Sequence, residues 1–60
     1  RRESLSQLRQ DLPRLRQLLF EIQRELRQTD TRNVLSVGLY KKGDELEKLA
    51  KRVRKNIRKL

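Results

Sequence analysis

Residues 33–49 read NVLSVGLYKKGDELEKL, and this stretch decides between two folds. It contains both glycines of the chain, a small apolar cluster with β-branched residues, and more than one signal for the start of a helix. The segments before and after it have the composition of long helices. The chain is therefore either one continuous rod through this stretch or a hairpin that reverses close to it.

Upstream of this stretch, apolar residues recur at alternating steps of three and four over three heptads. They are Leu5, Leu8, Leu12, Leu15, Leu19, Ile22 and Leu26. This spacing predicts successive a and d positions of a left-handed coiled coil. Leu18 and Phe20 widen the apolar stripe, which favours a bundle of three or four helices over a two-stranded zipper. The heptads continue through Pro13, so we expect one bent helix from Ser4; a later start at Asp11 is the alternative.

The last third of the chain predicts a second amphipathic helix, in which apolar and basic residues occupy separate arcs. The apolar arc contains Leu46, Leu49, Ala50, Val53, Ile57 and Leu60. The basic arc contains Lys48, Lys51, Arg52, Arg54, Lys55, Arg58 and Lys59. On a straight helix of 3.6 residues per turn, this apolar arc points roughly 180° away from the stripe of the first helix. One continuous helix therefore cannot bury both stripes against the same partner.

The best place for a reversal is QTDTRN, residues 28–33, which has no apolar side chain. Asp30 and Thr31 are good N-caps, and a connection of this length joins antiparallel helices. The alternative places the break at Gly43 and Asp44 and leaves residues 34–40 as a strand or loop. We therefore predict an all-α fold with a helix over residues 4–28, a turn over 29–33 and a helix over 34–60.

This antiparallel, coiled-coil type hairpin of residues 1–60 is predicted to be a single oligomerisation module. Two helices are too few to cover their own apolar residues, and a chain this short is marginal on its own. We expect a homo-oligomer, with a dimer of hairpins forming a four-helix bundle as the favoured assembly. The predicted oligomer interface consists of Leu5, Leu8, Leu12, Leu15, Leu18, Leu19, Ile22, Leu26, Leu35, Leu39, Leu46, Leu49, Val53, Ile57 and Leu60.

The charge of the chain suggests two further functions. There are 17 Lys and Arg residues against 8 Asp and Glu, a net charge of +9, and most of the excess lies in the second half. The basic arc therefore predicts binding to nucleic acid or another polyanion through phosphate contacts, without base-specific readout. A hetero-coiled coil with an acidic partner protein is the other alternative. Membrane binding is disfavoured because the basic helix has no Trp.

Other function classes have little support in the composition. The chain has no Cys and no His, so we expect no metal site, no cofactor and no disulfide. The carboxylates are spread along the helices, which argues against an enzyme. Because the chain starts at Arg1 and has no apolar run long enough for a membrane span, we expect part of a larger intracellular protein, cytoplasmic or nuclear.

Overall fold

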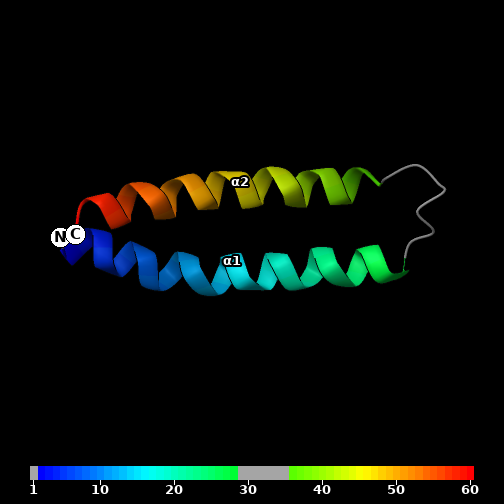
Figure 1. The fold of residues 1–60 in the computed structure, drawn as a ribbon, viewed down its shortest axis with the longest axis horizontal. Helices are drawn as coiled ribbons and strands as arrows, with labels where there is room; N and C mark the ends of the chain where they lie inside the picture. Colours follow the sequence, from blue (N-terminus) through cyan, green and yellow to red (C-terminus); the bar gives the residue numbers. More distant parts are fainter. Residues whose placement is uncertain (1, 29–35) are drawn as a thin grey trace.

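The computed structural model describes residues 2–28 and 36–60, which form two helices packed side by side (Figure 1). Helix α1 is Arg2–Gln28 and helix α2 is Val37–Arg58. The helices run in opposite directions, so both ends of the chain lie at the same end of the molecule. The Cα atoms span 46 × 14 × 13 Å. The predicted helical hairpin is confirmed; the predicted turn over residues 29–33, and Leu35 with it, lie outside the described residues.

Helix α1 begins two residues earlier than predicted and continues through Pro13 without a break. The alternative start at Asp11 is therefore wrong. Glu3 lies in the first turn and Arg27 in the last, and both charges complement the helix dipole. The regular heptad spacing upstream and downstream of Pro13 lets the same side of the helix face α2 over its whole length.

Helix α2 is capped by Ser36, and the predicted caps Asp30 and Thr31 lie outside the described residues. The Ser36 Oγ accepts a hydrogen bond from the backbone N–H of Leu39 at 3.1 Å. The same hydroxyl donates to the carboxylate of Glu25 on α1 at 2.6 Å. Ser36 therefore satisfies one free N–H of the first turn and also ties the start of α2 to α1.

Both glycines lie inside α2, so the alternative with a break at Gly43 and Asp44 is also wrong. Neither glycine has a positive φ. A Cβ on Gly43 would meet nothing within 4 Å, and a Cβ on Gly38 would meet only the Ser36 Oγ, at 3.8 Å. A close approach between the two helices therefore does not explain the glycine at either position.

The core between the two helices is small and includes three buried polar side chains, Ser4, Asp11 and Asn56. Its buried apolar side chains are Leu8, Leu18, Leu49 and Val53, and Leu18 is fully buried. The row Ser4, Asp11 and Leu18 thus faces α2, whereas the row Leu5, Leu12, Leu19 and Leu26 of the predicted seam lies to one side and stays partly exposed. This row faces α2 because α2 carries polar partners for it. Arg52, for example, binds Asp11.

Candidate functional site

One edge of the hairpin is closed by polar contacts, of which the most buried is between Asp11 and Arg52. The Arg52 guanidinium donates two hydrogen bonds to the Asp11 carboxylate, both at 2.7 Å, and Gln7 donates a third at 3.0 Å. Asp11 is only 3% exposed. The hydrogen bonds from Arg52 lower the pKa of Asp11 despite its burial, which acts in the opposite direction. Asp11 therefore stays charged and fixes the register of the two helices.

Two further ion pairs continue along this edge toward the connection. Arg14 donates to both carboxylate oxygens of Glu45, at 2.8 and 3.0 Å. Lys42 donates to Glu25 at 3.1 Å and lies 3.9 Å from Glu21. The hydrogen bond from Arg14 lowers the pKa of Glu45, and those from Ser36 and Lys42 lower the pKa of Glu25. Together with Asp11 and Arg52, these residues form a polar edge along the hairpin.

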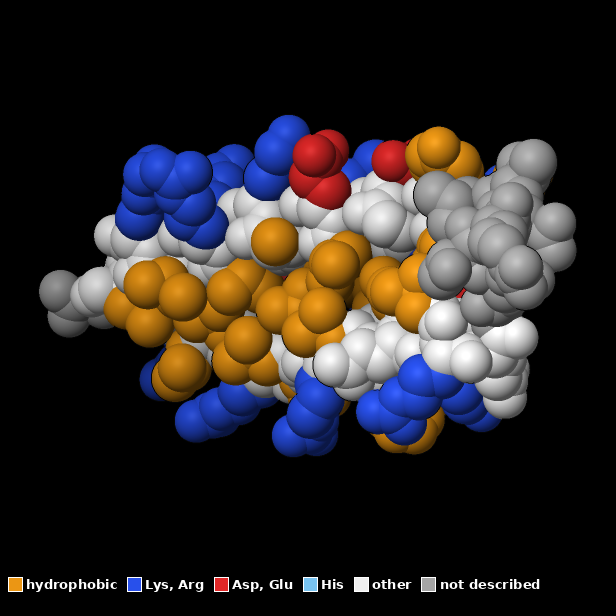
Figure 2. Space-filling model, turned by 45° about the vertical axis from the view of Figure 1, so that its right-hand side comes forward, with side chains coloured by type: hydrophobic (Ala, Val, Ile, Leu, Met, Phe, Trp, Pro, Cys, Tyr) orange, Lys and Arg blue, Asp and Glu red, His pale blue; other side chains and the backbone are white. Residues whose placement is uncertain are grey.

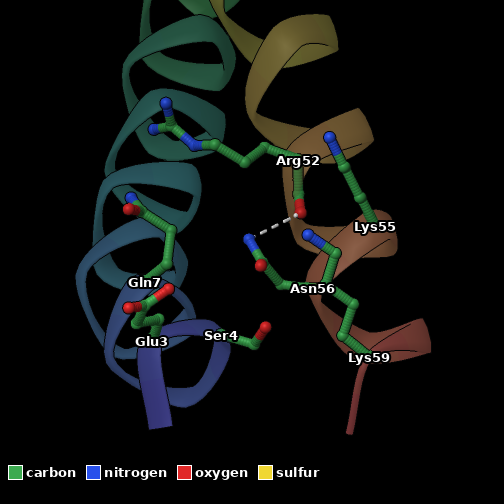
Figure 3. A pocket seen from close by; sticks show the side chains of 7 residues that line it. All are labelled: Glu3, Ser4, Gln7, Arg52, Lys55, Asn56 and Lys59. Atoms are coloured by element: carbon green, nitrogen blue, oxygen red, sulfur yellow. Dashed lines mark hydrogen bonds between the residues drawn. The ribbon is translucent and has the colours of Figure 1, made fainter. Parts of the chain in front are cut away.

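Polar side chains also line a hollow of about 290 Å³ at the end that holds the termini (Figure 3). The Ser4 hydroxyl on α1 points toward α2, whereas the Gln7 amide turns along α1 and donates to Asp11. Asn56 is buried and donates to the backbone carbonyl of Arg52 at 3.0 Å. The hollow is open and has Lys55 and Lys59 on its rim. Its uncharged donors therefore lie next to the basic arc of α2.

The opposite edge of the hairpin is apolar and uncovered. On α1 it contains a complete heptad row, Leu5, Leu12, Leu19 and Leu26, whose exposed fractions are 41, 48, 47 and 45%. The exposed Ala50 and Ile57 and the half-buried Leu39 and Leu46 on α2 lie on the same side, and the exposed Leu60 follows the end of this helix. We call these nine residues the open apolar face. A band of hydrophobic side chains along the junction of the two helices is visible in Figure 2.

The structure divides the predicted interface residues between two places. Leu8, Leu18, Leu49 and Val53 are buried inside the hairpin, and Leu15 and Ile22 are half-buried at its junction. The other predicted residues form the open apolar face, except Leu35, which lies outside the described residues. Phe20 and Tyr40 are 61 and 65% exposed and lie on other sides of their helices.

The predicted basic arc also divides. The guanidinium of Arg52 is bound to Asp11 and belongs to the polar edge. Lys48, Lys51, Arg54, Lys55, Arg58 and Lys59 are exposed on α2. Sequence reasoning missed the roles of Asp11, Asn56 and Ser36. One signal in the sequence could have indicated the role of Asp11. Ser4, Asp11, Leu18 and Glu25 recur every seven residues, so they form a second row on α1 beside the leucine row.

Neither described helix is long and apolar enough to cross a membrane. Within the two described segments, no group of three His, Cys, Asp or Glu side chains is placed to hold a metal ion. Comparison of the chain with known protein families, with other proteins and with solved structures gives no match.

Proposed function

We propose that the chain is an assembly module that pairs with a second copy of itself through the open apolar face. The observation that supports this most strongly is the row Leu5, Leu12, Leu19 and Leu26, in which every side chain is more than two fifths exposed. Contiguous exposed apolar surface of this kind marks an interaction site on a soluble protein. In the proposed assembly two hairpins pack face to face as a four-helix bundle, in the manner of other coiled-coil type bundles.

The total surface area agrees with a dimer. The chain exposes 5340 Å², whereas a compact monomer of 7.3 kDa is expected to expose about 4,200 Å². The surplus, about 1,100 Å², follows from the elongated shape of the hairpin, 46 × 14 × 13 Å, and leaves room for an interface of standard size, roughly 800 Å² on each partner. A second hairpin has the same length and the same apolar width, so it matches the face along its whole extent.

The charges around the face predict how salt affects self-association. Arg9 and Arg16 are exposed and lie one turn beyond Leu5 and Leu12 on the outer flank of α1. Two copies would bring such cations together, and each carries a net charge of +9. Added salt screens this repulsion and should strengthen the dimer. A complex with an acidic partner protein should weaken with salt, so the sign of the salt effect separates the two.

The test compares two double variants that each remove two exposed large apolar side chains. Leu12→Gln/Leu19→Gln removes them from the open apolar face. Phe20→Gln/Tyr40→Gln removes them from outside this face, because each residue lies about 100° around its helix from the preceding leucine. We expect the first pair to weaken dimerisation at least about a hundredfold, since four leucines per dimer lose their burial. The second pair should leave the dimer mass in sedimentation velocity unchanged.

Equal effects of the two double variants would contradict the proposal. So would an unaltered chain that sediments as a helical monomer and forms a complex only with an acidic helical peptide.

A further inference from the structure

The fold concentrates positive charge at the end of the hairpin where the chain starts and stops. Residues 2–14 and 48–60 lie side by side at this end and contain ten Lys and Arg residues against two acids, a net charge of +8. Residues 15–28 and 36–47, toward the connection, contain five bases and five acids. Residues 48–60 carry +7 of this charge, and the hairpin places the weakly charged start of the chain, residues 2–14 with a net charge of +1, beside them.

Five of these cations form a strip on α2: Lys51, Arg54, Lys55, Arg58 and Lys59. All five are exposed, and together they line a shallow hollow of about 500 Å³ that no other residue lines. Along the helix axis the strip is roughly 12 Å long. Blue side chains gather on α2 toward the chain end in Figure 2, beside the apolar band and not within it.

Ion pairs within the described residues neutralise little of the charge of this strip. Arg14, Lys42 and Arg52 are engaged in the polar edge of the hairpin. Within the described residues, the strip makes one ion pair, between Lys51 and Glu47, which is long at 3.7 Å and highly exposed.

Repulsion within the strip destabilises helix α2. Cations three or four residues apart on one helix repel each other, and the strip contains several such pairs. The helix dipole favours bases in the last turn, which accounts for Lys55 and Arg58 but not for Lys51 and Arg54. Helix stability therefore does not explain the strip, and a ligand with dense negative charge would relieve its repulsion.

We infer that the basic strip binds the phosphate backbone of nucleic acid. The five cations lie next to one another with no apolar side chain among the residues that line their hollow, so the strip offers charge without the apolar anchors that a protein or membrane partner needs. A phosphate backbone needs only closely spaced cations. Lys55 and Lys59 also line the hollow of Figure 3, beside Ser4, Gln7, Asn56 and the carboxylate of Glu3.

Binding through this strip should tolerate any base sequence, because Lys and Arg on phosphates carry no sequence information. With five phosphates neutralised, the affinity should fall several hundredfold between about 50 and 200 mM salt.

The test is fluorescence anisotropy with a labelled mixed-sequence DNA duplex and a scrambled duplex of the same composition. In the strip variant, Lys51→Gln/Lys55→Gln/Arg58→Gln, the same rise in salt should weaken binding only about tenfold, because two phosphate contacts remain. The matched control is Arg24→Gln/Arg27→Gln/Lys41→Gln, which removes the same charge from exposed positions toward the connection. We expect the control to keep the steep salt dependence of the unaltered chain. Circular dichroism should show both variants helical.

Three results would overturn the inference. The first is equal loss of affinity in the strip variant and the control, which would mean that net charge alone drives binding. The second is absence of binding to either duplex at micromolar protein in low salt. The third is displacement of the DNA by polyglutamate as effectively as by unlabelled duplex at equal charge, which would assign the strip to an acidic protein.

Discussion

At the scale of single residues, Asp11 is the most informative side chain in the hairpin. It is almost fully buried between two basic helices, yet three hydrogen bonds keep it charged. Arg52 is half exposed, so its charge is partly solvated while its guanidinium holds Asp11. Only one pairing of the two helices brings these groups together. This contact is therefore specific to the observed register.

The coupling between Asp11 and Arg52 should be measurable in a double-mutant cycle. We expect Asp11→Asn and Arg52→Gln to be coupled by about 1–2 kcal/mol in the free energy of unfolding, because the carboxylate is buried and bidentate. The pair Arg14 and Glu45 is exposed on both sides, 41 and 44%. Its coupling, from Arg14→Gln and Glu45→Gln, should be only about 0.2–1 kcal/mol. Equal couplings in urea unfolding would contradict this ranking.

The lowered pKa values of Asp11, Glu25 and Glu45 predict a loss of stability in acid. The unfolded chain binds more protons than the folded one between the ordinary pKa values, 3.8 for Asp and 4.5 for Glu, and the lower folded values. The free energy of unfolding should therefore be constant above about pH 5 and fall as the pH drops through the folded pKa values. Urea unfolding across this range should show the fall.

The triple variant Asp11→Asn/Glu25→Gln/Glu45→Gln supplies the control for the acid transition. It should be less stable than the unaltered chain at neutral pH, and its stability should depend much less on pH. A triple variant with the same acid transition as the unaltered chain would show that other carboxylates cause it.

At the scale of elements, heptad spacing predicted the first helix, separate apolar and basic arcs predicted the second, and the phase difference between the two apolar stripes predicted the reversal. The spacing also predicted the apolar side of each helix, because a step of three or four residues keeps side chains on one face. It could not predict which of two adjacent rows on α1 turns toward α2. That choice depends on pairs such as Asp11 with Arg52 and Glu25 with Lys42, whose members are 41 and 17 residues apart. The Ser36 cap was missed because no Glu or Gln follows it three residues later.

Gly43 gives a prediction about α2 alone. Since a Cβ at this position meets nothing in the hairpin, Gly43→Ala should raise the free energy of unfolding by about 1 kcal/mol. Gly38→Ala lies in the first turn, one residue after the helix begins, and should gain less. Thermal unfolding followed by circular dichroism measures both. A loss of stability in Gly43→Ala would mean that a partner helix approaches this position closely in the assembly.

At the scale of the whole molecule, the hairpin has two different edges and one charged end. Its polar edge is closed by pairs within the chain, whereas its apolar edge remains exposed to solvent. The exposed leucines Leu5 and Leu12 lie outside the small core, and the four buried apolar side chains found in residues 2–28 and 36–60 are few for a stable hairpin. Folding and association should therefore be coupled, with helicity falling on dilution as the dimer dissociates.

Sedimentation equilibrium of the unaltered chain, from low to high micromolar concentration and at two salt concentrations, tests this account most directly. We predict a reversible equilibrium between 7.3 kDa and twice that mass, shifted toward the dimer by higher protein concentration and by added salt. A chain that remains fully helical at 7.3 kDa over the whole range would contradict the proposal that the open apolar face is an assembly surface.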